Sequence, residues 1–237
     1  FVPSRAPKGK VAQLMIFGAT VISVDGSYED TFALSKAAID RWGWYNRNAA
    51  INPYLSEGKK TVTFELMEQL HWQVPDYVAL SVGDGCTIAG VWKGFKDLYE
   101  TGFIDRLPKL ISTQAEGCCP LNRALQTGEP WQPMEENTLA DSIAVGVPRN
   151  ADKALNAVRE SKGIAVNVSD EEILGAMRLL GRTQGVFGEP AGVTGTAGVK
   201  KALELGLIDP DATVVSIVTG NGLKDVANAI KACGDPI

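Results

Sequence analysis

The sequence has 237 residues with an ordinary globular composition (45% hydrophobic, 22% charged) and a formal net charge of −5, which leaves room for one large α/β domain or two small ones. The acidic balance argues against nucleic acid as a partner, because the longest basic runs are pairs such as Lys59-Lys60. No apolar run approaches the ~20 residues of a membrane helix and no signal peptide stands at the front, so we expect no membrane contact and a cytoplasmic location.

The first part of the chain predicts two short strands and two helices. Residues 1–3 end a strand, and prolines mark the loop that follows. Residues 8–17 predict a helix that ends at Gly18, and residues 19–26 predict a strand closed by an Asp-Gly turn. The apolar side chains of residues 28–43 have helical spacing.

Helices and strands alternate through most of the remaining chain. The predicted helices cover residues 57–70, 87–101, 151–161, 169–185, 190–206 and 223–232. The predicted strands cover residues 76–82, 109–115, 163–168 and 213–220. We expect residues 117–148 to be irregular apart from one helix near 138–145, and we expect Trp42, Trp44, Trp72 and Trp92 in the core. This alternation predicts a three-layer α/β fold: a mostly parallel sheet with helices on both faces.

A glycine-rich loop follows the predicted strand 76–82. Gly83 and Gly85 let the backbone approach an anion, and the amides of Gly85, Cys86 and Thr87 would be the free first donors of the next helix. We expect Asp84 to take part through its backbone only, with its carboxylate turned away from the anion. The alternative is a tight strand-to-helix turn without a ligand, because the segment lacks the complete spacing of known phosphate loops.

A second glycine loop, in the stretch IVTGNGLKD, follows the predicted strand 213–220. Thr219 stands at the end of that strand, where its hydroxyl could contact a ligand lying across the sheet. The alternative is that Thr219 or Asn221 simply caps the last helix. Both glycine loops lie where parallel sheets bind ligands, beyond the carboxyl ends of the strands.

The cysteines and the single histidine give no sign of a metal site. The four cysteines form no CxxC pair, and His71 is the only histidine. We therefore expect no metal, no disulfide framework and no Ser-His-Asp triad, and we interpret the thiols as buried or idle.

Five stretches taken together resemble threonine synthase, a family of pyridoxal-phosphate enzymes of the tryptophan-synthase-β type, or fold type II. They are EGKKTVTFELMEQL, PDYVALSVGDGCTIAGVWKGF, STQAEGCCP, DEEILGAMRLLGRTQGVFGEPAGVTGTAGVKKALELGLI and SIVTGNGLKD. The opening residues FVPSRAPKGKVAQLMIFGATVISVDGSYED are similar to the later part of the family's small domain. The resemblance implies that residues 1–50 are a remnant of a small domain and that residues 51–237 form the large cofactor-binding domain.

The resemblance also implies the ligand of both loops, pyridoxal 5'-phosphate. The implied cofactor-binding residues are Gly83, Asp84, Gly85, Cys86, Thr87 and Thr219, with the last at the pyridine nitrogen. Asn52 is similar to a position that faces substrate in the family, although an Asn before proline can equally form a turn. Glu189 either faces the same pocket or stabilises the start of the helix that follows it.

The resemblance implies the conversion of O-phospho-L-homoserine and water into L-threonine and phosphate, by a homodimer. The family's Schiff-base lysine and Ser-Gly-Asn loop have no counterpart in these 237 residues, so we assign no catalytic residue and expect an inactive fragment. Two alternatives stay open. One is another fold-type-II enzyme, either a threonine or serine dehydratase or a synthase that uses O-phosphoserine. The other is a non-catalytic phosphate-binding remnant.

Overall fold

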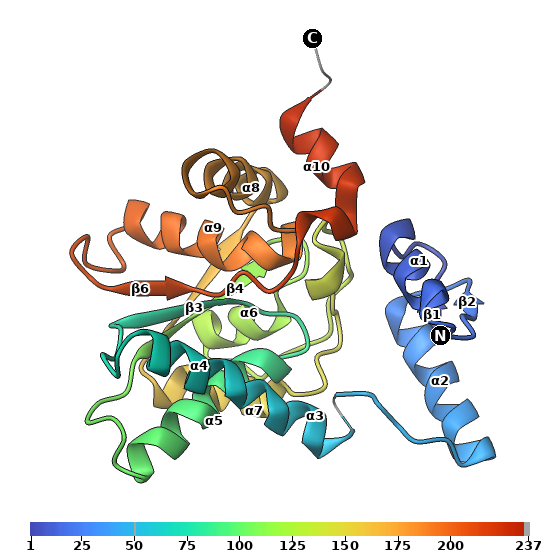
Figure 1. Ribbon diagram of the computed structural model, residues 1–237, viewed down its shortest axis with the longest axis horizontal. Helices are drawn as coiled ribbons and strands as arrows, with labels where there is room; N and C mark the ends of the chain where they lie inside the picture. The colour runs from blue at the N-terminus through green and yellow to red at the C-terminus, as the bar shows by residue number, and fades with distance from the viewer. Residues whose placement is uncertain (50, 235–237) are drawn as a thin grey trace.

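The computed structural model describes residues 1–49 and 51–234 and contains two parallel sheets (Figure 1). The small sheet pairs β1 (Val2–Pro3) with β2 (Ser23–Val24). The large sheet has the order β5-β4-β3-β6, and all of its pairs are parallel. Its strands are β3 (Tyr77–Ser81), β4 (Lys109–Ala115), β5 (Ile164–Val168) and β6 (Val214–Ser216). The predicted α/β fold with a parallel sheet is therefore confirmed.

One face of the large sheet is covered by four helices. They are α4 (Thr61–Gln69), α5 (Cys86–Glu100), α6 (Pro120–Thr127) and α7 (Ala151–Glu160). Phe95 of α5 and Met67 of α4 are fully buried here against Val78 and Leu80 of β3. Since a parallel sheet is buried on both faces, β3 is largely apolar, whereas the neighbouring central strand β4 carries three buried polar side chains, Ser112, Thr113 and Gln114.

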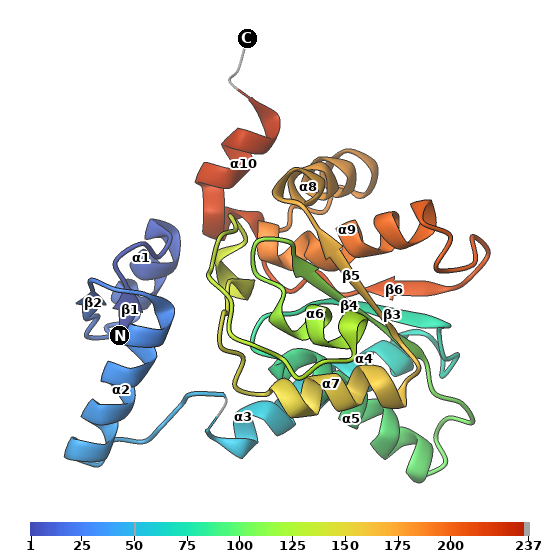
Figure 2. The same cartoon turned by 180° about the vertical axis from the view of Figure 1, so that it is seen from behind.

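The opposite face carries α8 (Asp170–Gln184), α9 (Pro190–Glu204) and α10 (Val226–Cys233). Ala79 and Ile111 of the sheet pack there against Val193 and Ile173. The small residues of α9 bring this helix unusually close to the strands: a Cβ at Gly198 would lie 2.0 Å from the Thr113 hydroxyl oxygen. The sheet and its two helical layers thus form the three layers that the sequence predicted (Figure 2).

The N-terminal part lies beside this three-layer body in both views (Figure 1, Figure 2). It consists of the small sheet with α1 (Lys8–Ile16) and α2 (Tyr28–Trp42). Ser27 and Asp30 form a capping box at the start of α2, and Gly43 ends the helix in the left-handed conformation. The chain then reaches the body through α3 (Pro53–Glu57) and a 3-10 turn, η1 (Gly58–Lys60).

Five local predictions from the sequence were wrong. The predicted strand 19–26 pairs only over Ser23–Val24. Residues 117–148 contain a full helix, α6, while the helix expected near 138–145 is only a short 3-10 turn, η2 (Asp141–Ile143). The predicted strand 213–220 pairs only over Val214–Ser216, after which the chain leads into η3 (Gly222–Asp225). The predicted helix 57–70 is divided into η1 and α4. Three tryptophans expected in the core are substantially exposed: Trp42, Trp44 and Trp72.

None of the helices in residues 1–49 and 51–234 combines the length and the apolar character that crossing a membrane requires.

Candidate functional site

A cavity of about 220 Å³ lies at the carboxyl ends of β3 and β6. It brings together all six residues that the sequence assigned to one ligand: Gly83, Asp84, Gly85, Cys86, Thr87 and Thr219. The two glycine loops are 132 residues apart at Thr87 and Thr219 (219 − 87 = 132), and they meet because β6 is the direct parallel neighbour of β3. The position agrees with the general rule for ligand sites in parallel sheets.

The two glycines of the first loop are required by the protein's own packing. Gly85 has φ +84°, and a Cβ there would lie 2.8 Å from the Ala154 Cβ and 2.9 Å from the Asn150 carbonyl oxygen. A Cβ at Gly83 would lie 2.9 Å from the Ile143 Cα. The reason that the sequence analysis gave for these glycines, room for an anion, is therefore incomplete. They also let the loop approach the backbone of residues 143–150.

The same loop presents hydrogen-bond donors that the protein itself does not use. The amides of Gly85, Cys86 and Thr87 precede or begin α5, and none of them donates to an acceptor within residues 1–49 and 51–234. The hydroxyls of Thr87 and Thr219 likewise have no partner in the described part of the chain. These donors lie around one cavity, at the positive end of a 15-residue helix. The chemistry of the set fits a phosphorylated ligand.

Asp84 is oriented as the sequence analysis expected. Its Oδ1 accepts a hydrogen bond of 2.7 Å from the Arg149 amide and lies 3.8 Å from the Arg149 guanidinium. Its carbonyl oxygen accepts from the Asn150 amide at 3.1 Å. The carboxylate is thus held by the neighbouring segment and partly balanced by Arg149, which weakens the repulsion that it would exert on an anion.

Lys59 also lines the cavity, and the sequence analysis did not assign it. Its neighbour Lys60 is engaged elsewhere, at 2.5 Å from Glu57 and 2.9 Å from Asp97. Lys59 makes no ion pair among the described residues. The Lys59-Lys60 pair was a visible signal, but the sequence could not tell which of the two ammonium groups faces the loop.

Two groups beside the loop have shifted pKa values. Burial raises the pKa of the Cys86 thiol and the Asp84 carboxylate adds to the effect, while Lys59 opposes it. Burial also raises the pKa of the Tyr28 phenol, again with a contribution from Asp84. The Cys86 sulfur accepts from the Asn150 side-chain amide at 2.8 Å. Both groups therefore stay protonated at neutral pH and add no negative charge near the loop.

Asn52 is placed differently from the six loop residues. It is 8% exposed and is not among the residues that line the cavity. Its side-chain amide donates to the Tyr45 hydroxyl at 2.7 Å and the Asn46 carbonyl at 2.9 Å, and its Oδ1 accepts from the Tyr54 amide. The observed contacts are those of a turn-forming residue that caps α3.

Glu189 precedes Pro190 at the start of α9, and its side chain makes no capping hydrogen bond. Its carboxylate is buried under the second loop, where a Cβ at Gly220 would lie 2.0 Å from Oε1. The Lys10 ammonium of α1 lies 3.4 Å from Oε2. Glu189 therefore connects the second loop to the N-terminal part of the chain.

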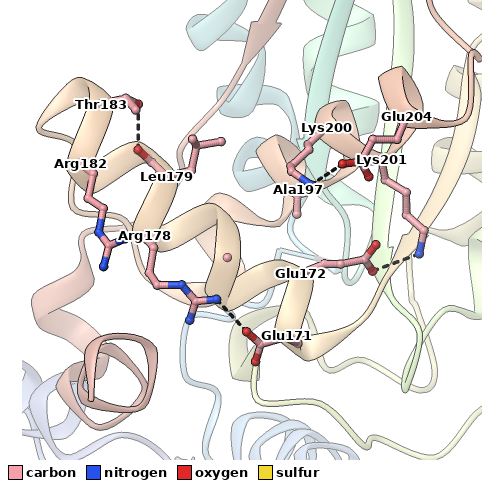
Figure 3. Close-up of a pocket in the computed structure, with 11 residues that line it drawn as sticks. Glu171, Glu172, Arg178, Leu179, Arg182, Thr183, Ala197, Lys200, Lys201 and Glu204 are labelled. Atoms are coloured by element: carbon pink, nitrogen blue, oxygen red, sulfur yellow. Dashed lines mark hydrogen bonds and ion pairs between the residues drawn. The ribbon is translucent and has the colours of Figure 1, made fainter. Parts of the chain in front are cut away.

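A larger hollow of about 500 Å³ lies between α8 and α9 (Figure 3). Three of its cations are neutralised by carboxylates of the same hollow: Arg178 by Glu171, Lys200 by Glu204 and Lys201 by Glu172. Its polar groups are therefore largely satisfied by the protein. The smaller cavity, with its unused donors, is the better candidate.

Known proteins resemble this chain over nearly its whole length. Residues 1–220 match the family described as pyridoxal-phosphate dependent enzyme. Threonine synthase of Methanosarcina acetivorans is 44% identical over 230 residues, which are 96% of this chain and 56% of that protein. Threonine synthase of Methanocaldococcus jannaschii is 45% identical over 233 residues, which are 97% of this chain and 57% of that protein. The chain thus spans somewhat more than half the length of these relatives.

Solved structures give the same fold at lower sequence identity. Maize serine racemase superimposes with a TM-score of 0.77 at 22% identity and covers 98% of this chain, which spans 68% of that structure. The processed threonine deaminase isoform 2 of Solanum lycopersicum has a TM-score of 0.73 at 22% identity, with coverages of 98% and 64%. At this level of identity the likeness concerns the fold alone.

Proposed function

Because the chain belongs to the pyridoxal-phosphate-dependent enzyme family, we propose that it forms part of a threonine synthase. The reaction would convert O-phospho-L-homoserine and water into L-threonine and phosphate. The relatives that share 44% and 45% identity with nearly the whole chain are threonine synthases, which supports this choice within the family. The activity is proposed for the whole protein, because these residues span only 56–57% of those relatives.

The observation that carries the proposal is the meeting of both glycine loops around one cavity. When bound, pyridoxal phosphate supplies an electron sink for the negative charge that develops on a substrate carbon. The amides of Gly85, Cys86 and Thr87 would hold its phosphate together with the Thr87 hydroxyl. The partial positive charge at the N-terminus of α5 would stabilise the bound phosphate by about 0.3–1 kcal/mol.

Thr219 and Lys59 complete the proposed set. The Thr219 hydroxyl would meet the ring nitrogen and, being neutral, would not hold a proton there as an aspartate does. Lys59 would supply the positive charge that the loop amides lack. The sequence analysis expected Asn52 to face substrate; we propose instead an indirect contribution, through the turn before α3 that its side chain holds, and the KM of an Asn52→Ala variant measures that contribution.

Product analysis tests the reaction on the protein as its source produces it. O-phospho-L-homoserine should give threonine and phosphate in equal amounts. Release of a keto acid and ammonia from threonine or serine would instead identify a dehydratase, and turnover of O-phosphoserine would identify a synthase of that type. A protein that binds no pyridoxal phosphate would be the non-catalytic remnant.

The other properties of the whole protein are proposals of the same kind. We propose a small-molecule amino-acid phosphoester as substrate and a homodimer, both of which the family resemblance implies, together with a cytoplasmic location. Sedimentation of the native protein measures its oligomeric state. A monomer at the concentration used to assay activity would contradict the proposed homodimer.

A further inference from the structure

The N-terminal part of the chain makes its polar contacts with the body through a small set of residues beside the cavity. Arg5 pairs with Glu136. Lys10 donates to the Ser142 hydroxyl at 2.6 Å and lies near Glu189. Ser142 itself lines the cavity. The irregular segment 129–150 therefore lies between the N-terminal helices and the first glycine loop.

Arg149 makes the most extensive of these contacts. Its guanidinium pairs with Glu29 in the first turn of α2 and lies over the Phe32 ring, 3.8 Å from the centroid. The Tyr28 ring lies 5.2 Å from the same group. The Arg149 side chain is only 11% exposed, although its partner Glu29 is 49% exposed. The buried guanidinium packs on the Phe32 ring, and this contact adds to an ion pair that water screens on the Glu29 side.

The backbone of Arg149 and its neighbour hold the loop itself. The Arg149 amide donates to the Asp84 carboxylate, and the Asn150 amide donates to the Asp84 carbonyl oxygen. The Asn150 carbonyl oxygen packs against Gly85 so closely that no side chain fits there. A displacement of Arg149 would therefore move the residues that fix the loop.

We propose that Arg149 is a positioning residue that couples the placement of α2 to the geometry of loop 83–87. The inference rests on the proposed function only where it concerns pyridoxal phosphate, because the coupling itself is a property of the cofactor-free protein. Breaking the contacts between α2 and Arg149 should weaken the hydrogen bonds that the Arg149 and Asn150 amides donate to Asp84, although no residue of the loop has been changed.

Hydrogen exchange in the cofactor-free, full-length protein tests the coupling. The reporters are the amides of Asn150 and Ala89, which donate to the carbonyl oxygens of Asp84 and Gly85. Glu29→Gln removes the ion pair on the α2 side and should accelerate exchange of both amides at least threefold. Lys36→Gln is the matched control, since it breaks the Lys36–Asp40 pair on the same helix.

Equal exchange at the reporter amides in Glu29→Gln and Lys36→Gln would overturn the inference. Acceleration that spreads uniformly over α4 and α5 would also overturn it, because it would indicate general destabilisation rather than a local link. An Arg149→Met variant should reproduce the Glu29→Gln effect and exceed it, since it also removes the contacts with Phe32 and Tyr28.

Titration with pyridoxal phosphate separates this inference from the proposed function. If the native protein binds the cofactor, Glu29→Gln should weaken its affinity at least threefold while Lys36→Gln leaves it unchanged. If the native protein does not bind it, the proposed function fails, and the exchange experiment still decides whether Arg149 couples α2 to the loop.

Discussion

Gly85 illustrates how one residue can serve both packing and ligand binding. Its left-handed backbone starts α5, and its missing side chain admits the backbone of Asn150. The sequence indicated that a glycine was needed at a strand-to-helix turn. It could not indicate that the obstacle to a side chain is a segment 65 residues away (150 − 85 = 65), because that contact depends on the tertiary fold.

A Gly85→Ala substitution should lower the free energy of unfolding by about 2–4 kcal/mol, the sum of left-handed strain and overpacking. Gly102→Ala is the control, since Gly102 has φ +78° but nothing within 4 Å of its added Cβ. It should cost only about 1–2 kcal/mol. Urea unfolding of both variants measures the difference, and equal midpoints would show that the close approach to Asn150 is unimportant.

Lys59 and Lys60 are adjacent in sequence but have different surroundings. If Lys59 balances a bound phosphate, Lys59→Met should weaken pyridoxal-phosphate affinity roughly 10- to 100-fold, as expected for a charge-assisted hydrogen bond. Lys60→Met should leave the affinity unchanged, because Lys60 is paired with Glu57 and Asp97. Titration of the cofactor-free protein followed by absorbance distinguishes the two. Similar losses in both variants would contradict the role of Lys59.

At the scale of elements, α6 is the helix that the sequence analysis missed. It begins at Pro120, directly after two cysteines, and its amphipathic pattern is only eight residues long. Because prolines and glycines surround this short pattern, the sequence predicted an irregular segment instead of a helix. Its position is fixed instead by Asn122, a buried polar residue that hydrogen-bonds across strands. Such a network depends on neighbours from β4 and β5 and leaves no local periodicity.

An Asn122→Ala variant should therefore lose about 2–4 kcal/mol of stability. The Asn122 side-chain amide donates to the carbonyl oxygens of Ser112 and Val166, and its Oδ1 accepts from the Ser112 hydroxyl at 2.6 Å. Removing it leaves those buried groups unpaired. Asn156→Ala on the exposed side of α7 provides the control and should change stability by less than about 0.5 kcal/mol. Thermal unfolding of both proteins tests the difference.

Helix α8 starts with a capping box formed by Ser169 and Glu172, and this box makes stability depend on pH. Burial raises the pKa of Glu172, but hydrogen bonds from Ser169 and Lys201 outweigh it and lower the pKa below its ordinary value of 4.5. A carboxyl with a lowered folded-state pKa stabilises the protein above the unfolded pKa. That contribution is lost as the pH falls below 4.5 through the folded value.

Glu172→Gln should thus cost about 0.5–1 kcal/mol at pH 7, and the difference from wild type should shrink as the pH is lowered below about 4.5. Denaturant unfolding at several pH values provides the measurement. In a Ser169→Ala background the same substitution should cost less, because half of the capping box is already gone. A Glu172→Gln penalty that stays constant down to pH 3 would show that the carboxylate contributes through its shape and not its charge.

At the scale of the whole molecule, the alternation of helices and strands predicted the layers correctly, but it did not predict contacts between residues that are distant in sequence. Alternating helices and strands sufficed for the parallel sheet and its two helical layers. The pairing of Arg149 with Glu29 and of Lys10 with Glu189 joins residues more than a hundred positions apart, and no local pattern indicates it. The exposed Trp42 was misplaced for the same reason, since helical spacing alone does not show which face of a helix finds a partner.

The predicted boundary between residues 1–50 and 51–237 can be tested on the native protein by limited proteolysis. The large sheet buries two apolar clusters, whereas α1 buries no residue and α2 buries only Thr31 and Ala38. Chymotrypsin should therefore cut first near Trp44 and Tyr45, which are 51% and 71% exposed and follow the end of α2. A fragment that starts near residue 45 or 46 should resist further digestion, because its two cores remain intact. Simultaneous loss of both parts would show that they unfold as one cooperative unit, joined firmly by Arg149 and Lys10.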